Sequence, residues 1–447
     1  MSESSLLRAW RQLPTNASEA LVTTNFVLPH LFEALEFSES ERIPQFQTGL
    51  GGRAVDFAAR HNIIGEDIFL DNRENPNLLV ELKGRDINLS ESSAQYASTV
   101  RQLHQYMLSS KCHSVQWGLM TNSNHWQLFR KHGKVVFPVT QCLATNEHNL
   151  EATVHLIHEK ISKPSKALVV AIYNNKGGVG KTTTTLNLAA ILNGLGKKVL
   201  VVDFDPNQRD LTQALRSSAK EVTLYKCLDD RRLDPIQAIQ NFCVKTKQGK
   251  SLGFDILPAD DELASSSSYT GILQRAKEDR LGEVIDLFRE NYDYILIDAP
   301  PNWQYFSQSA VYASDVVLMP IKHNNIFSIE NAAQAIAKLI PQIKQKRQDG
   351  CPHVLPVFFN GERMTDPQRA VAEKLIDGLI VKYKKEERFD LLPYFYPRWH
   401  STKDRSIFTL PSFAVISNAG FAHLPAVYVN KIAKDYYQGL VKEYFFQ

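Results

Sequence analysis

The alternation of apolar and polar positions predicts a first region of mixed helices and half-buried strands. Apolar residues recur at helical spacing over 18–36 and 93–109. They alternate with polar residues over 55–59 and 78–84, and a strand, a tight turn and a second strand follow over 115–129. This combination predicts an α/β domain whose sheet carries polar side chains on one face.

A second region is marked by short, continuous apolar runs that alternate with helical segments. Such runs are typical of parallel strands buried on both faces. We predict a helix over 182–195 and strands over 167–172, 198–203, 294–298, 316–321, 353–360 and 391–397. This order predicts a mainly parallel, doubly wound sheet.

The segment between the two regions reads as a connector. A helical pattern covers 147–161, and a polar linker that contains Pro164 follows it. We therefore predict an α/β protein with a first domain over 1–142, a connecting helix and linker over 143–166, and a second domain over 167–447.

Composition indicates a globular protein with large cores, because 43% of the 447 residues are hydrophobic and 22% are charged. No apolar run approaches the roughly 20 residues that a membrane helix needs. The opening residues Met-Ser-Glu-Ser-Ser lack a secretion pattern, so we expect a cytoplasmic protein that does not enter a membrane. The cysteines include no Cys-x-x-Cys pair and predict neither a zinc site nor disulfides: Cys112, Cys142, Cys227, Cys243 and Cys351.

Charge is distributed unevenly along the chain. The first 160 residues carry a formal charge of −3 and the remainder carries +6. A basic cluster with interleaved aromatic residues lies near the C-terminus: Tyr394, Tyr396, Arg398, Trp399, His400, Lys403 and Arg405. It predicts contacts to the phosphates of DNA, and the alternative is a solvated loop whose aromatic side chains cover the core.

Residues 176–183, Lys-Gly-Gly-Val-Gly-Lys-Thr-Thr, lie between a predicted strand and a predicted helix. In such a turn, backbone N–H groups and the helix N-terminus face a bound phosphate. Lys181 is expected to reach the β- and γ-phosphates, and the Thr182 hydroxyl is expected to bind Mg²⁺. The motif departs from the ordinary P-loop because Asn175 replaces its first glycine and Lys176 adds a second lysine.

With that second lysine, the motif resembles the deviant Walker A motif of the ParA/MinD family of ATPases. The resemblance implies ATP and Mg²⁺ as cofactors and a homodimer that forms on ATP binding, with Lys176 reaching the partner's nucleotide. It also implies that Asn360 contacts adenine. The ATP-binding residues are then Lys176, Gly177, Gly178, Val179, Gly180, Lys181, Thr182, Thr183 and Asn360.

Three aspartates at the ends of predicted strands complete this family pattern. The resemblance places Asp203 and Asp298 near Mg²⁺ together with Thr182, and Asp205 beside the attacking water. Lys176, Lys181 and Asp205 are thus the expected catalytic residues of the ATPase. A metabolic ATPase of the nitrogenase-iron-protein type is a weaker alternative, because no cysteine pair is placed to bridge an iron–sulfur cluster.

The first region carries its own set of candidate catalytic residues. Asp56 and Glu81 lie on neighbouring predicted strands and could hold one Mg²⁺ through carboxylate oxygens. Lys83 follows two positions later on the same face, where it could orient a metal-bound water. The alternatives are solvated charges on an exposed sheet face, or an inactive nuclease fold retained to bind DNA.

This Asp…Glu-x-Lys arrangement resembles the PD-(D/E)xK nucleases. With Gln102, Tyr106, Thr121-Asn122 and Trp126-x-Leu-Phe, residues 15–140 are similar to the restriction-endonuclease-like N-terminal domain of type I restriction enzyme R subunits. The resemblance implies Glu19 as an accessory acid near the metal and Gln102 as a supporting residue. Val55 stands where the superfamily name has proline.

Two functions follow from these resemblances. The first is an ATP-regulated, Mg²⁺-dependent DNA endonuclease, with duplex DNA as its expected substrate, in prokaryotic defence against phage or plasmid DNA. The alternative is a ParA-like partition or positioning ATPase, associated with the nucleoid, whose N-terminal domain is an adaptor for an unidentified partner protein. The intact set of Asp56, Glu81 and Lys83 favours the nuclease, because an adaptor has no need of all three.

Overall fold

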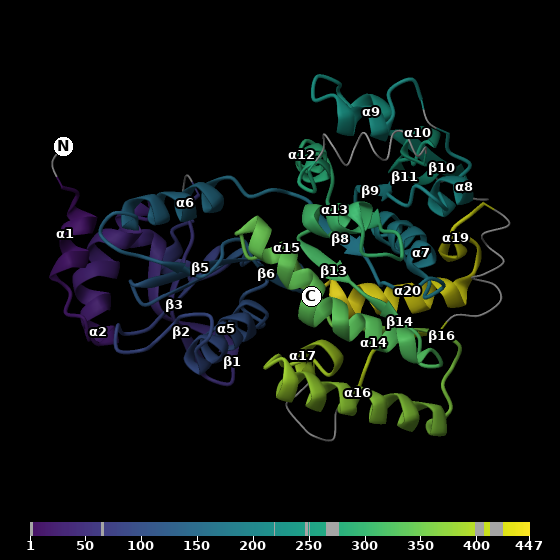
Figure 1. Cartoon of the computed structure of the whole chain (residues 1–447). Coiled ribbons are helices and arrows are strands. Elements are labelled where there is room, and N and C mark those ends of the chain that lie inside the picture. Colours follow the sequence, from purple (N-terminus) through teal and green to yellow (C-terminus); the bar gives the residue numbers. More distant parts are fainter. Residues whose placement is uncertain are drawn as a thin grey trace. The chain divides into compact units, whose positions relative to one another are not determined.

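The computed structural model describes the chain except for residues 1–2, 64–66, 219, 246–248, 250, 265–276, 398–405 and 412–422. The chain folds into two compact units (Figure 1). The first unit comprises Met1–Pro164, Gln348–Gly350 and Phe445–Gln447, and the second comprises Ser165–Arg347 and Cys351–Tyr444. None of the described helices is long and apolar enough to cross a membrane.

A seven-stranded mixed sheet forms the centre of the first unit, in the order β1-β2-β3-β4-β5-β6 with β7 beside β5. Its strands are β1 (Arg42–Leu50), β2 (Arg53–Ala59), β3 (Leu78–Leu82), β4 (Trp117–Thr121), β5 (His125–His132), β6 (Val135–Pro138) and β7 (Leu143–Ala144). β3 and β4 run parallel, and the other pairs are antiparallel. The strands predicted over 55–59, 78–84 and 115–129 are confirmed. The pattern does not predict β1, because Pro44 and Gly49 interrupt its alternation.

The described helices of the first unit are α1 (Ser5–Gln12), α2 (Glu19–Val22), η1 (Thr23–Leu31), α3 (Phe32–Ala34), η2 (Glu39–Glu41), α4 (Phe69–Asn72), α5 (Ala94–Met107) and α6 (Leu150–Ser162). The segment predicted as a single helix begins as α2 behind the N-cap Ser18, but it continues as a π-helix that contains Pro29. Proline has no N–H to close an α-helical bond, and the wider π turn accommodates it.

Helix α6 is an integral part of the first unit. Its buried residues Val154 and Ile157 belong to the same core as Phe57 of β2. Helix α5 packs on a second core, where Leu103 joins Leu79 of β3. Much of the segment that the sequence presents as a connector is therefore structural, and the chain enters the second unit at Ser165.

The second unit is built on a seven-stranded sheet in the order β10-β11-β9-β12-β8-β13-β15, with a small sheet of order β14-β16-β17. The strands are β8 (Leu168–Ile172), β9 (Val199–Asp203), β10 (Gln240–Lys245), β11 (Ser251–Leu257), β12 (Tyr294–Asp298), β13 (Val316–Leu318), β14 (Pro320–Ile321), β15 (His353–Val354), β16 (Phe358–Gly361) and β17 (Thr409–Pro411). All described pairs are parallel except β10 with β11, so the mainly parallel sheet is confirmed.

The predicted strand over 391–397 is wrong, because this segment contains helix α17 (Leu392–Phe395). Pro393 lacks the N–H that a ladder needs but fits the first turn of a helix. The other described helices of the unit are α7 (Lys181–Gly194), α8 (Asp210–Ala214), α9 (Leu224–Asp229), η3 (Pro235–Ala238), α10 (Asp261–Ala264), α12 (Arg280–Asp286), α13 (Tyr305–Ala313), α14 (Ile326–Gln334), η4 (Ala335–Leu339), α15 (Ile340–Arg347), α16 (Asp366–Glu386), α19 (Ala426–Val429) and α20 (Lys431–Tyr444).

Candidate functional site

The strand order of the second unit brings the glycine-rich loop beside two of the predicted aspartates. β12 lies between β8 and β9, so Asp298 is in register with Asp203 on one side and with Ile172 on the other. The loop follows β8 and leads into α7, and the Thr182 hydroxyl hydrogen-bonds to Asp298. The carboxyl ends of these parallel strands therefore gather the loop and both acids at one edge of the sheet.

The glycines give the loop its curvature. Gly178 and Gly180 have φ of 73° and 88°, in the left-handed region that side chains disfavour. A Cβ at Gly178 would meet nothing within 4 Å, whereas a Cβ at Gly180 would lie 2.3 Å from the Asn360 amide nitrogen. The loop is thus open at Gly178, where a phosphate could approach the backbone, and tightly packed at Gly180.

Asn360 braces this loop from the end of β16. Its side-chain nitrogen donates to the carbonyl of Val179 at 2.9 Å and lies 3.4 Å from the Thr184 hydroxyl. Asn360 is buried, so the brace is shielded from solvent. The expected contact of Asn360 with adenine stays a prediction, and the structure adds a structural role that the sequence does not indicate.

Lys181 and Asp298 form the buried centre of the site. Lys181 is 8% exposed, and its amino group donates to the carbonyl of Lys176 at 3.3 Å. Burial lowers the pKa of Lys181, and the carboxylates of Asp298 and Asp205 oppose this shift. Burial and the neighbouring Asp203 raise the pKa of Asp298, whose Oδ1 has no hydrogen-bond partner. A buried carboxylate oxygen without a donor is suited to a cation.

The other two aspartates are more fully engaged by the protein. Asp203 Oδ2 accepts hydrogen bonds from the backbone N–H and the hydroxyl of Thr212, at 2.8 and 2.6 Å. Burial raises the pKa of Asp203 to about 6, against these bonds from Thr212. Asp205 Oδ1 accepts from the backbone of Asn207 and Gln208, at 3.1 Å each. These bonds fix the orientation of both side chains.

Lys176, the second lysine of the loop, is half-buried and lies beside an exposed aromatic ring. Its amino nitrogen is 5.8 Å from the centroid of Phe327, at the start of α14. Phe327 is 61% exposed and the preceding Ile326 is 48% exposed. A lysine that rests on an exposed ring can move at small energetic cost.

The first unit assembles Glu19, Asp56, Glu81 and Lys83 from α2, β2 and the end of β3. Lys83 Nζ lies 2.6 Å from Glu81 Oε1 and 3.9 Å from Glu19 Oε2. Asp56 Oδ2 accepts the backbone N–H of Leu82 at 2.7 Å. The four residues that the sequence proposes are thus brought together in one acid cluster around a lysine.

Electrostatics sets Glu81 apart within this cluster. Glu81 is only 1% exposed, and its Oε2 has no hydrogen-bond partner. Burial, followed by the negative charge of Asp56, raises the pKa of Glu81 to about 7 despite the ion pair with Lys83. Burial would lower the pKa of Lys83, but Glu81, Asp56 and Glu19 raise it. The cluster therefore holds excess negative charge that an added cation would relieve.

Gly84 allows α2 to approach this cluster. A Cβ at Gly84 would lie 2.8 Å from the Glu19 nitrogen and 2.9 Å from the Ala17 carbonyl oxygen. The N–H of Arg85 donates to the same carbonyl at 2.8 Å. The close contact brings the N-terminus of α2, and with it Glu19, beside the end of β3.

Two polar residues near the cluster escape prediction from sequence. Gln45 of β1 donates from its side-chain nitrogen to Asp56 Oδ1 at 3.3 Å. The carboxylate of Asp86 contributes to the raised pKa of Glu19, after burial and Asp56. Gln102, predicted as a supporting residue, donates to the Tyr106 hydroxyl at 2.9 Å within α5.

Neither acid site supplies a complete metal shell. Among the residues that the structure describes, no group of three or more His, Cys, Asp or Glu side chains is arranged to hold a metal ion. Mg²⁺ commonly takes one or two carboxylates and completes its shell with water and substrate phosphates. The unpartnered oxygens of Glu81 and Asp298 fit that role.

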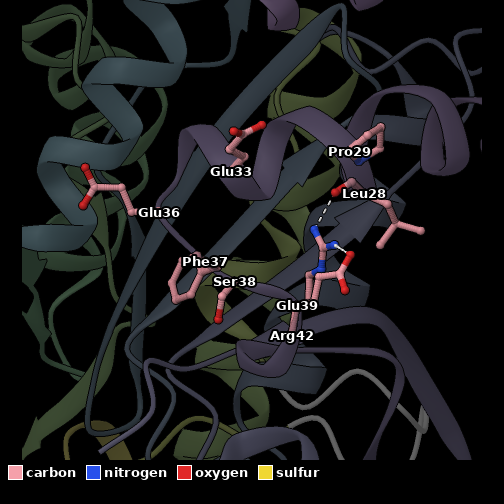
Figure 2. A pocket seen from close by; sticks show the side chains of 8 residues that line it. All are labelled: Leu28, Pro29, Glu33, Glu36, Phe37, Ser38, Glu39 and Arg42. Atoms are coloured by element: carbon pink, nitrogen blue, oxygen red, sulfur yellow. Dashed lines mark hydrogen bonds and ion pairs between the residues drawn. The ribbon is translucent and has the colours of Figure 1, made fainter. Parts of the chain in front are cut away.

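A cavity of about 430 Å³ in the first unit is lined by Leu28, Pro29, Glu33, Glu36, Phe37, Ser38, Glu39 and Arg42. Figure 2 shows Arg42 bonded to the Leu28 carbonyl and paired with Glu39, and no acid-cluster residue lines this cavity.

Of the predicted basic cluster, Arg398, Trp399, His400, Lys403 and Arg405 lie outside the described residues, and Tyr396 is buried in the core.

Comparison with known proteins concerns the second unit. A family model described as an AAA domain matches residues 167–350. The sporulation initiation inhibitor protein Soj of Bacillus subtilis (strain 168) is 34% identical over 168 residues, which are 38% of this chain and 63% of Soj. The chromosome partitioning protein ParA of Caulobacter vibrioides is 34% identical over 169 residues, which are 37% of this chain and 60% of ParA. The chain thus spans less than two thirds of either relative.

One relative is matched over most of its length. The uncharacterized protein MJECL24 of Methanocaldococcus jannaschii is 31% identical over 233 residues, which cover 51% of this chain and 84% of that protein. Among solved structures, the ATP complex of a McdA variant from Cyanothece overlaps 62% of this chain and 96% of its own, with 19% identity and a TM-score of 0.47. Through its second unit, the chain belongs to the ParA/MinD-type P-loop ATPases.

Proposed function

We propose that this chain is a partition or positioning ATPase that dimerises on binding ATP, attaches to DNA in that state, and carries its first unit with it. One observation carries the proposal. The Lys176–Thr183 loop sits at the edge of a parallel sheet, with buried Lys181 beside Asp298, in a chain similar to proteins named for chromosome partitioning. Attachment to DNA makes it a cytoplasmic protein of the nucleoid.

The residues of the second unit fit Mg²⁺ and ATP. The N–H groups around Gly178 would bind the phosphate oxygens, and the amino group of Lys181 would neutralise part of their negative charge. Thr182 and the unpartnered Oδ1 of Asp298 would hold Mg²⁺, which neutralises phosphate charge when it is bound. Asp205, fixed by two backbone N–H groups, would orient the attacking water.

Lys176 supports the dimer in this proposal. Lys181 already occupies the interior of the loop, so its own subunit does not need a second lysine there. Lys176 instead rests half-buried over the exposed ring of Phe327. From there it would reach a nucleotide held by a second copy of the chain. The ATP dimer would then place two nucleotides between two facing loops.

Binding to fluorescent duplex DNA of random sequence tests this function. We expect wild-type protein to bind with ATP and Mg²⁺ far more tightly than without ATP, with little sequence preference and a steep decline with salt. Lys181→Ala should lose the response to ATP. Lys198→Ala, at an exposed lysine directly before β9, should keep it. Equal DNA affinity with and without ATP in the wild-type protein would contradict the proposal.

A second candidate function concerns the first unit, which we propose to be a Mg²⁺-dependent nuclease of the PD-(D/E)xK type. The observation that favours it is the buried, unpartnered Oε2 of Glu81, whose carboxylate lies beside Asp56 and is ion-paired with Lys83. If the ion pair of Glu81 and Lys83 served only the fold, it would not require further carboxylates beside it. Bound Mg²⁺ would supply an activated water and neutralise a phosphate, while Lys83 would hold that water in place.

Incubation of supercoiled plasmid with Mg²⁺ tests the nuclease. Wild-type protein should nick and linearise the plasmid, and Glu81→Gln should cut at least about 100-fold more slowly. The loss of a direct metal ligand should cost more than the loss of a residue that only orients a ligand, which typically costs about 10- to 100-fold. Glu74→Gln, at an exposed acid in the loop before β3, is the matched control and should cut normally. Full cleavage by Glu81→Gln would remove the nuclease from consideration.

The two functions are compatible within one molecule. The described part of each first unit holds a single acid cluster, so cutting both strands of a duplex would require two copies of the chain. An ATP dimer would supply them at high effective concentration. Under this arrangement Lys181→Ala would nick plasmid but linearise it slowly, in keeping with a nuclease of prokaryotic defence that is controlled by assembly. Identical nicking and linearisation time courses for wild type and Lys181→Ala, with ATP present, would mean that the two units are merely tethered.

A further inference from the structure

Gln45 has an unusual backbone for a residue in the interior of a strand. Its φ is +47°, in the left-handed region that residues other than glycine seldom adopt. The other residue of β1 with positive φ is Gly49, which has no side chain to clash. Strained backbone of this kind persists only where its surroundings enforce it, and it occurs often at functional sites.

The distortion lies opposite the first acid of the cluster. In the antiparallel pair, Pro44 is the partner of Phe57 and Phe46 is the partner of Val55, so Gln45 faces Asp56. At this position the side-chain amide of Gln45 donates to Asp56 Oδ1 at 3.3 Å. The N–H of Leu82 donates to Asp56 Oδ2 at 2.7 Å. The carboxylate is therefore held by donors from the strands on both sides of β2.

The chemistry of the two donors differs from that of Lys83. An amide and a backbone N–H are neutral, so they orient the carboxylate without cancelling its charge. Lys83, in contrast, forms an ion pair with Glu81 at 2.6 Å. Each Asp56 oxygen keeps a lone pair, and the full negative charge stays available to a divalent cation.

We propose that Gln45 is a positioning residue: its strained backbone aims a neutral amide at Asp56 and so pre-orients that carboxylate for a divalent metal. The inference rests on the nuclease function proposed above. It assigns Gln45 to the support of a metal ligand, and it explains why a left-handed residue that is not glycine stands at this point of β1.

Packing offers a competing explanation for the strain. Ile43 and Phe46 are three positions apart, yet both are buried in the same core, which a regular strand would not allow. A left-handed residue between them achieves this packing whatever its side chain does. The substitution Gln45→Gly separates the two explanations, because glycine keeps the backbone and removes the amide.

The test is Mn²⁺ affinity of the full-length protein, measured by titration calorimetry in an Asp298→Asn background, which removes the unpartnered carboxylate of the second unit. Gln45→Gly and Gln45→Ala should both weaken Mn²⁺ binding by about 10-fold, as does the loss of a hydrogen-bond donor that orients a metal ligand. Gln45→Gly should unfold at a higher temperature than Gln45→Ala, because only glycine relieves the strain. Gln47→Ala, an exposed glutamine on the same strand, is the matched control and should bind as the parent does.

Each outcome decides the matter. Parent-like Mn²⁺ affinity in Gln45→Gly would overturn the positioning role and leave packing as the reason for the strain. Equal weakening in Gln45→Gly and Gln47→Ala would also overturn it, since the effect would then belong to the strand in general. Glu81→Gln should abolish Mn²⁺ binding in the same background. If the parent binds no Mn²⁺, or if its binding survives Glu81→Gln, the nuclease proposal itself fails, and this inference fails with it.

Discussion

The two acid sites of this chain place a lysine among buried carboxylates in two different ways. In the first unit, Lys83 is ion-paired directly with Glu81 at 2.6 Å. In the second unit, the amino group of Lys181 donates to a backbone carbonyl, while Asp298 accepts a hydrogen bond from the Thr182 hydroxyl. Both sites leave one carboxylate oxygen unpartnered, on Glu81 and on Asp298.

The difference lies in what surrounds each lysine. The second unit adds a turn of glycines, open at Gly178, whose N–H groups suit an anion, so its lysine is part of an anion cradle. The first unit surrounds its lysine with Glu19, Asp56 and Glu81, so its surplus charge is negative. Under the functions proposed above, the second unit would receive an anion together with its metal, and the first unit would receive a cation before any substrate.

The largest expected effect comes from removing the lysine of the anion cradle. Lys181→Ala takes a buried positive charge away from the phosphates, and loss of one such electrostatic contact typically slows catalysis by about 100- to 1,000-fold. We expect a fall of this size in the steady-state ATP hydrolysis rate. The matched variant Lys83→Ala should hydrolyse ATP at the wild-type rate. A comparable fall in the hydrolysis rate of both variants would show that the two sites do not have separate roles.

The pH dependence of stability should differ between wild type and Glu81→Gln. The pKa of Glu81 is raised to about 7 in the folded protein from an ordinary value of 4.5. The native state therefore holds the proton more tightly than the unfolded state. Stability from this group is fully present below pH 4.5 and is lost as the pH rises through 7, by up to about 3 kcal/mol.

Urea unfolding at pH 5 and at pH 8, without divalent metal, measures this effect. Wild type should lose more stability than Glu81→Gln between the two pH values, and Mn²⁺ should restore it at pH 8 because it binds the ionised carboxylate. If the two proteins show the same pH dependence, the first site holds no surplus charge and the contrast with the second site is lost.

How far the sequence predicts each site follows from how each is built. The glycine-rich loop is contiguous, from Lys176 to Thr183, and its acids end recognisable buried strands, so the second site can be proposed residue by residue. The first site draws Glu19 and Gln45 from segments before the motif. Glu19 is reached only through resemblance to a family, and Gln45 is not reached at all.

The contacts that escape prediction share a physical reason. β1 is interrupted by Pro44 and Gly49, so its alternation is lost and with it the register that sets Gln45 against Asp56. Asn360 braces Val179 from a strand 181 residues further along the chain, and nothing local marks that contact. The predicted strand over 391–397 shows the converse error, because an apolar run with Pro393 forms a helix.

A smaller effect is expected at Gly84, where the first site depends on close backbone packing. A Cβ there would press on the backbone at Ala17 and Glu19, and overpacking typically costs about 1–3 kcal/mol. We expect Gly84→Ala to lower the stability of the first unit by that amount and to slow plasmid cleavage. In Gly378→Ala on α16, the new Cβ meets nothing within 4 Å, so stability should not fall.

The smallest effect is expected at Phe327. Its ring supports Lys176 only through an exposed cation–π contact, of about 0.5–1 kcal/mol. Phe327→Leu should therefore change the dissociation constant of the ATP dimer by no more than about fivefold. Complete loss of the dimer would show that the ring itself, rather than Lys176, holds the two copies together.

Sedimentation velocity with and without ATP tests most directly whether the second unit is an assembly switch. We predict a monomer without nucleotide and a dimer with ATP and Mg²⁺ for the wild-type protein. Asp205→Ala should remain a dimer after the wild type has hydrolysed its ATP and dissociated, and Lys181→Ala should remain a monomer throughout. The same sedimentation coefficient for wild-type protein in the presence and absence of ATP would contradict the account.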